Sequence, residues 1–341
     1  MIRHIASSIA YASYIKISIA EFSTNRIDHA NWVGYPWATR VGLDAPWFAA
    51  LRNSGEPTGT PVEMLEFIVA ILLLVLGGLA AVLLSARPQA AQAAGQIGAI
   101  AGSALGLFVS IRALVTGEVE GMSGAWPMPG GGLHVEIDPL SAFFLLPVFG
   151  LSVVTGLYGR SYLAGGDSGR GSAATWFHLN LLTAAMALVI TARDGLLFLL
   201  AWEIMALAPF FLVIFNDRQA SVRHAAWTYL AATHLGTAFL LVLFVMVGGL
   251  AGTSDFSGYA AALRDHPTLS SGVFLLALVG FGSKAGIVPA HVWLPEAHPV
   301  APSHASALMS GAMIKVGIYG LVRINFDAGN MMRKSDMMYE A

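Results

Sequence analysis

The sequence predicts an all-α membrane protein, a polytopic bundle of about eight transmembrane helices with a broken helix around Lys284. Of its 341 residues, 56% are hydrophobic and only 11% are charged, whereas a soluble domain carries roughly 25% charged residues. The mean hydropathy is +0.68. Eight apolar stretches reach about 20 residues, the length at which a helix crosses a bilayer. A fold of this composition has too few polar groups to cover a water-exposed surface.

The composition also excludes several kinds of chemistry. The chain has no cysteine, so disulfides, thiolate metal sites and iron–sulfur ligation are ruled out. The net charge of -2 offers no basic field to attract nucleic acid. The sequence lacks metal-ligand spacing, a full nucleotide-binding glycine motif and a nucleophile elbow. We therefore expect no cofactor, no metal and no catalytic site of the chain's own.

The first 61 residues differ from the rest of the chain. They mix polar and aromatic residues, with basic side chains at Lys16, Arg26 and Arg40, and they end in the linker-like stretch SGEPTGTP. We interpret 1–61 as a polar N-terminal extension, either a poorly ordered tail or the product of an upstream start of translation. The transmembrane domain is expected over 62–325, and a polar tail follows over 326–341.

Within that domain, the apolar stretches are expected to be helices because lipid offers no hydrogen bonds to a bare backbone. They do not show the alternation typical of a membrane β-strand. Two contain a proline that favours a kink, at Pro147 and Pro209. The expected segments are 67–84, 93–115, 139–158, 175–192, 195–215, 225–249, 271–294 and 301–324.

The connections between these segments predict an orientation. Basic residues concentrate on one side of the membrane, which the positive-inside rule assigns to the cytoplasm. Connection 116–137 has three glutamates and no lysine or arginine, so it is expected outside. A multi-pass protein of a bacterial or archaeal cytoplasmic membrane is predicted. The basic residues on the inner side are Arg87, Arg160, Arg170, Arg218 and Arg223.

Two ionisable residues are predicted deep in the bilayer, where charge is costly unless it faces a polar interior. Glu203 lies near the middle of its segment, too deep for its short side chain to reach water. Lys284 lies among small residues, with Gly282 and Gly286 on either side and Pro289 five residues later. These residues favour an interrupted helix, which occurs at membrane depth only beside a cavity or within protein. If Glu203 approaches, Lys284 holds its proton; if Glu203 moves away, the proton is released. The alternative is a structural salt bridge that never titrates.

Further candidates lie on neighbouring segments. Lys315 is well inside the last segment, beside small residues that allow close helix approach. Arg323, nearer the end, is expected to anchor the helix at the interface. His234 is either a relay member or a satisfied core histidine. His298 and His304 flank the last connection and are candidates for a wet cytoplasmic mouth of a proton path, since histidine titrates near neutral pH.

Two long motifs resemble a known family. They are ITARDGLLFLLAWEIMALAPFFLV, over 190–213, and GFGSKAGIVPAHVWLPEAHPVAPSHASALMSGAMIKVGIYGLVR, over 280–323. DPLSAFFLL, over 138–146, adds a third match. Together they resemble the proton-conducting antiporter-like membrane subunits of complex I, cation antiporters and group 4 hydrogenases. The Ser303-His304 pair is most similar to the hydrogenase-4 component B and formate hydrogenlyase subunit 3 branch.

The resemblance implies roles and partners. Glu203 matches the glutamate that partners the broken-helix lysine, Lys284 matches that lysine, and Lys315 matches a lysine that passes protons onward. The implied partners are other membrane subunits of a hydrogenase or complex I-like oxidoreductase assembly. The implied transported ion is the proton or the sodium ion. Members have two inverted repeats, of which this chain matches only the first, over 175–325. The chain is therefore expected to be a fragment, a truncated product or one piece of a split subunit. Two other functions also remain open: a non-conducting structural subunit and a sodium/proton antiporter subunit.

Overall fold

The computed structural model describes residues 61–124, 131–164, 169–216, 218–264 and 266–327. The predicted N-terminal extension, apart from Pro61, and the tail from residue 328 lie outside this range. Over the described residues, eight helices are long and apolar enough to cross a membrane, which confirms the predicted all-α bundle. They are α4 (Pro61–Leu83), α5 (Pro88–Thr116), α6 (Pro139–Ala164), α7 (Gly169–Thr191), α8 (Gly195–Val213), α9 (Ala220–Ala251), α11 (Pro267–Ala285) and a composite eighth span of three consecutive elements.

The composite span begins with α13 (Ser303–Leu308), passes through a π-helical turn, η4 (Met309–Met313), and ends with α14 (Ile314–Asp327). A π-turn within a helix is uncommon and often marks a functional position. Nothing in the residue pattern predicts it. Lys315 is the second residue after this turn.

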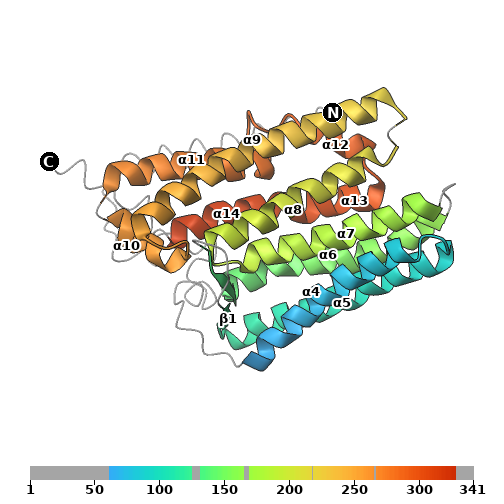
Figure 1. The fold of residues 1–341 in the computed structure, drawn as a ribbon, viewed down its shortest axis with the longest axis horizontal. Helices are drawn as coiled ribbons and strands as arrows, with labels where there is room; N and C mark the ends of the chain where they lie inside the picture. Colours follow the sequence, from blue (N-terminus) through green and yellow to red (C-terminus); the bar gives the residue numbers. More distant parts are fainter. Residues whose placement is uncertain (1–60, 125–130, 165–168, 217, 265, 328–341) are drawn as a thin grey trace, which may run out of the picture. The chain divides into compact units, whose positions relative to one another are not determined.

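The long helices lie side by side, with α4 and α5 at one edge and α9 and α11 at the other (Figure 1). Helix α7 packs between α4 and α8, α8 packs on α9, and α11 packs on both α9 and α14. The centre of this arrangement is aromatic. Phe198 and Trp202 of α8 stack 5.7 Å apart, and the ring of Phe281 on α11 meets Trp202 edge-on at 5.4 Å. Burial of such rings contributes strongly to helix packing.

The connection predicted as an outer loop contains a small hairpin. Strands β1 (Glu120–Gly124) and β2 (Leu133–Ile137) pair antiparallel, with Glu120 opposite Ile137. A single bridge joins Val135 of the hairpin to Ala192 in the α7–α8 connection, and a second joins Asp194 in that connection to Asp255 in the α9–α10 connection. Short helices η2 (Ile214–Asn216), η3 (Phe256–Gly258), α10 (Tyr259–Arg264) and α12 (Leu294–Val300) complete the connections.

The predicted segment 271–294 is interrupted directly after Lys284. Helix α11 ends at Ala285, and Gly286 takes the left-handed conformation with φ of 74°. The backbone N–H groups of Gly286 and Ile287 both donate to the carbonyl of Gly282 and so close the helix end. Pro289 lies in the turns that lead to α12. Lys284 therefore occupies the last turn of α11, whereas the apolar pattern had suggested a helix continuing to residue 294.

Candidate functional site

Lys284 is fully buried although it carries an ionisable amine. Its Nζ donates to the hydroxyl of Tyr229 at 3.3 Å. The same atom lies 5.3 Å from the ring centre of Tyr229 and 5.7 Å from that of Trp202. Aromatic faces attract a cation, but they accept no conventional hydrogen bond. The three donors of an ammonium group are thus served by one acceptor and two rings.

Two hydrogen bonds hold the walls of this aromatic site in place. Tyr229 donates its hydroxyl to the carbonyl of Ala206 on α8 at 3.0 Å. Trp293, in the segment after the helix break, donates its Nε1–H to the carbonyl of Ser283 at 2.8 Å. Trp293 also meets the ring of Tyr229 edge-on at 5.2 Å. The chain that leaves α11 is therefore fastened back onto the turn that carries Lys284.

Glu203 faces a different partner. Its Oε2 lies 3.2 Å from Nε2 of His234 on α9. The Nδ1 of His234 lies 3.0 Å from the carbonyl oxygen of Leu230, one turn earlier. Neither side chain is fully covered by the chain, with exposed fractions of 32% for Glu203 and 44% for His234.

Among the described residues, Glu203 and Lys284 do not form the ion pair that the family resemblance implies. Trp202, next to Glu203 on α8, occupies the side of the helix under Lys284, so the carboxylate turns toward α9. Glu203 still acts electrostatically on both Lys284 and Tyr229. Its second oxygen, Oε1, is buried and finds no hydrogen-bond partner in the part of the chain described. Glu203 Oε1 is therefore free to accept a hydrogen bond, and the ammonium group of Lys284 has donors left to give one.

Lys315 lies close to this site along the backbone but points elsewhere. Gly317, one half-turn later, packs so tightly on α11 that an added Cβ would sit 2.6 Å from the backbone nitrogen of Ala285. The Lys315 side chain itself is exposed, and its Nζ donates to the carbonyl of Ser310 in the π-turn at 2.7 Å. The structure brings the backbones of the two lysine turns together without joining their amines.

The two predicted histidines at the last connection differ in surroundings. His298 is half-buried, its Nδ1 lies 3.1 Å from Ser306 Oγ, and burial lowers the pKa of its imidazole. His304 is buried, and its ring meets Tyr162 edge-on at 5.2 Å. Within the described ranges, neither ring nitrogen of His304 has a hydrogen-bond partner. Buried polar atoms of this kind are rare and are commonly served by water.

A second polar cluster was not predicted. Arg323 of α14 is buried and donates to both oxygens of Asp138, at 2.7 and 2.6 Å, so the expectation that it anchors the helix at the interface is wrong. Arg193 lies 3.3 Å from the same carboxylate. Burial alone would raise the pKa of Asp138, but the two guanidinium groups hold it well below its usual range. This paired network joins α6 to the α7–α8 connection and to α14.

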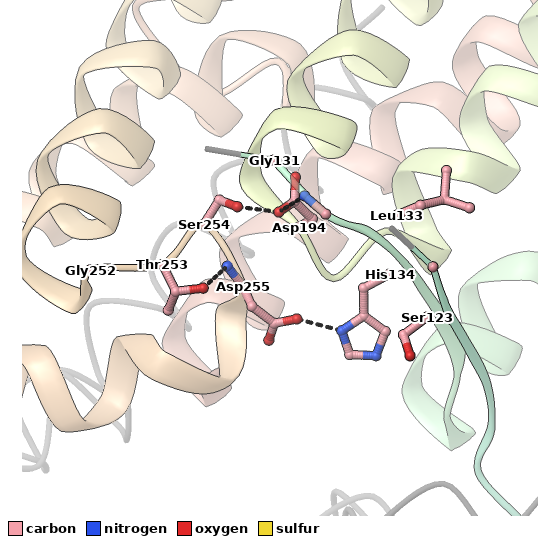
Figure 2. Close-up of a pocket in the computed structure, with 11 residues that line it drawn as sticks. Ser123, Gly131, Leu133, His134, Asp194, Gly252, Thr253, Ser254 and Asp255 are labelled. Carbon is pink, nitrogen blue, oxygen red and sulfur yellow. Dashed lines mark hydrogen bonds and ion pairs between the residues drawn. The ribbon is translucent and has the colours of Figure 1, made fainter. Parts of the chain in front are cut away.

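A cavity of about 400 Å³ lies beside this network, between the hairpin and the α9–α10 connection. Figure 2 shows His134 pointing to Asp255 and Ser254 pointing to Asp194. The hydrogen bond with Asp255 raises the pKa of His134 despite its burial. Burial opposes ionisation of Asp255, but hydrogen bonds from His134 and Ser257 lower its pKa to about 2. Asp194 accepts backbone bonds from Gly132, Leu196 and Leu197. The carboxylates are thus occupied by the protein's own donors, and the cluster is structural.

Sequence reasoning also missed the residues that surround Lys284. Tyr229, Trp202 and Trp293 are aromatic residues in apolar segments, and such residues are usually ordinary core. The available signal was Trp202 directly before the glutamate that is predicted deep in the bilayer. For the described residues, groups of three or more metal-ligating side chains are not found.

Residues 192–339 match the transmembrane family model described as NADH:quinone oxidoreductase/Mrp antiporter. This part of the chain therefore resembles the transmembrane domain of that family. Its matched region contains the broken helix, the buried lysine and the π-turn.

Among curated relatives, the chain is 36% identical to "Hydrogenase-4 component B" of Escherichia coli over 76% of its own length and 38% of the relative's. It is 29% identical to "Formate hydrogenlyase subunit 3" of the same organism, over 69% of the chain and 36% of the relative. It is 36% identical to an "NAD(P)H-quinone oxidoreductase chain 4" of Microcystis aeruginosa, over 58% of the chain and 35% of the relative. The chain thus spans somewhat more than a third of the length of these relatives.

Two solved complexes contain a chain of the same fold. The archaeal membrane-bound sulfane sulfur reductase gives a TM-score of 0.66 at 24% identity, covering 79% of this chain and 42% of that one. The Mrp complex of Dietzia sp. DQ12-45-1b gives a TM-score of 0.64 at 24% identity, covering 77% of this chain and 29% of that one. Together with the eight apolar helices of the described residues, these matches establish the fold of a multi-pass integral membrane protein.

Proposed function

We propose that this chain is a proton-translocating subunit of a membrane-bound hydrogenase or complex I-like oxidoreductase. In this proposal Glu203 and Lys284 form the first part of a proton path, and Lys315 receives protons from them. The observation that carries the proposal is the state of Lys284, which is fully buried beside a helix break with a tyrosine as its hydrogen-bond acceptor. A purely structural lysine at this depth would be expected to hold a carboxylate.

The electrostatic argument follows from that burial. Removing an ammonium group from water costs several kcal/mol unless an opposite charge compensates. With Glu203 turned toward His234, Lys284 lacks this compensation. With Glu203 turned toward Lys284, the ammonium form is stabilised. Rotation of one carboxylate side chain therefore switches Lys284 between holding and releasing a proton.

Two further steps of the proposal, proton transfer from Lys284 to Lys315 and proton entry at the mouth of the path, are supported by the positions of the residues. The close contact of Gly317 with Ala285 supports transfer from the Lys284 turn toward Lys315. In this proposal water bridges the gap between the amines of Lys284 and Lys315, as it commonly does between polar groups in protein interiors. His298 and His304, near the end of the last connection, supply titratable groups for a wet mouth of the path. We infer that other membrane subunits of the complex contact this chain and that it lacks a catalytic centre of its own.

The proposal is tested in a complete complex containing this chain, reconstituted into lipid vesicles. Glu203→Gln and Lys284→Ala are each expected to reduce proton pumping at least about tenfold, the loss typical of removing a proton-transfer group, while the complex still assembles. Arg160→Gln, at an exposed side chain, is the control and should pump normally. Normal pumping by both site variants would leave a non-conducting structural subunit as the better account.

A cation/proton antiporter subunit is the second candidate, because the matched family model also covers Mrp antiporters. The same vesicles distinguish the two. Proton movement that requires sodium ions on the opposite side would favour the antiporter, whereas pumping that proceeds equally well without sodium favours the proton translocator.

A further inference from the structure

The contacts of Glu203 and His234 bear on how many protons the two side chains hold. The carbonyl oxygen of Leu230 can only accept, so Nδ1 of His234, 3.0 Å away, carries a hydrogen. That leaves Nε2 facing Glu203 Oε2 at 3.2 Å. Without a hydrogen between them, two lone pairs would oppose each other. A proton shared between Nε2 and Oε2 removes that repulsion.

We propose that Glu203 and His234 form a proton-sharing dyad that sets the charge with which Glu203 reaches Lys284. In one form the proton is on Oε2, and a carboxylic acid faces a neutral imidazole. Transfer breaks the Oε2–H bond and forms the Nε2–H bond, which gives a carboxylate and an imidazolium. The net charge of the dyad is zero in both forms, so the transfer adds no net charge to a low-dielectric region.

The dyad matters because Lys284 responds only to the ionised form. A carboxylic acid that rotates toward Lys284 brings no charge to stabilise an ammonium group. Glu203 must leave its proton on His234 before it can act as the counter-ion of Lys284. Tyr229 and Lys284 are the neighbouring titratable groups on which Glu203 acts. His234 is thus a positioning residue of the switch, and this role in transport rests on the proposed function.

The chain supplies a matched control histidine. His178 on α7 makes the same local contact, with Nδ1 2.7 Å from the carbonyl of Ala174 four residues earlier. Its ring stacks on Phe211 at 4.7 Å, and over the described ranges it has no carboxylate partner. His178→Gln therefore repeats the chemical change of His234→Gln without touching the dyad.

The dyad is tested on the full chain in lipid nanodiscs by infrared spectroscopy of its carboxyl groups as the pH is changed. The Glu203 band is identified by its loss in Glu203→Gln. We expect this band to shift in His234→Gln and to stay unchanged in His178→Gln. A Glu203 band that is the same in His234→Gln and in the unaltered protein overturns the dyad.

Transport then separates this inference from the proposed function. In the complete complex, His234→Gln is expected to slow proton pumping about tenfold or more, while His178→Gln pumps normally. If Glu203→Gln abolishes pumping but His234→Gln leaves both pumping and the band unchanged, the dyad fails alone. If Glu203→Gln pumps normally while the band still shifts in His234→Gln, the dyad stands and the proposed function fails.

Discussion

At the scale of single residues, the protein buries charge in two different ways. Asp138 receives two hydrogen bonds from Arg323 and a further ionic contact from Arg193, so its charge is fully compensated. Lys284, equally buried, has the hydroxyl of Tyr229 and two aromatic faces. A compensated pair stabilises one arrangement, whereas an under-compensated amine can change state. The first cluster is therefore structural, and the second is suited to moving a proton.

The structural role predicts a stability effect. Arg323→Ala leaves the Asp138 carboxylate buried with Arg193 as its remaining cation, and breaking a buried pair in this way typically costs about 3–5 kcal/mol. Reversible unfolding in mild detergent measures the loss. Arg160→Ala, at an exposed arginine, should change the free energy of unfolding by less than about 0.5 kcal/mol. Equal effects of the two substitutions would contradict the distinction between the clusters.

The sequence indicated that Lys284 is buried but not which partners it meets. Counting apolar residues was enough to predict Glu203 and Lys284 deep in the membrane. The choice between His234 and Lys284 as partner of Glu203 depends on how α8 is rotated against its neighbours. Trp202, packed against Phe281, sets that rotation through tertiary contacts that no local pattern encodes. For the same reason, Arg323 was expected at the interface and lies instead on Asp138.

At the scale of elements, the end of α11 is the feature on which the site depends. Glycine and proline spacing predicted the interruption, because Gly286 can adopt a positive φ that other residues rarely take. The hairpin of β1 and β2 was missed, since strands of five residues are too short to give a periodic signal. The π-turn before Lys315 likewise has no signature in the sequence.

This element gives a prediction of its own. Gly286→Ala places a Cβ at a φ of +74° and 2.3 Å from Leu294 Cδ1, and the left-handed conformation alone costs about 1–2 kcal/mol. The melting temperature in detergent should fall accordingly. Gly150→Ala, within α6 and with open space around the new Cβ, is the matched control and should be neutral or slightly stabilising. An unchanged melting temperature for Gly286→Ala would show that the helix end does not require glycine.

At the scale of the whole molecule, the eight apolar helices found among the described residues surround a few ionisable groups that connect neighbouring helices. Composition and segment length were sufficient to predict this bundle, because every backbone group in a bilayer must be satisfied within its own helix. Helices α8, α9, α11 and α14 meet around Lys284, and α6, α7 and α14 meet around Asp138. The proposed path therefore lies in the half of the bundle that the family match covers.

The most direct test of the account replaces Lys284 by arginine, because arginine keeps a positive charge and hydrogen-bond donors but does not release its proton in a protein. Proton pumping by the complete complex in vesicles is the measurement, with Arg160→Lys as the control. The account predicts that Lys284→Arg assembles and loses pumping at least about tenfold, as expected for loss of a proton-transfer group. Pumping by Lys284→Arg near the level of the unaltered complex would contradict it, because a fixed charge would then suffice.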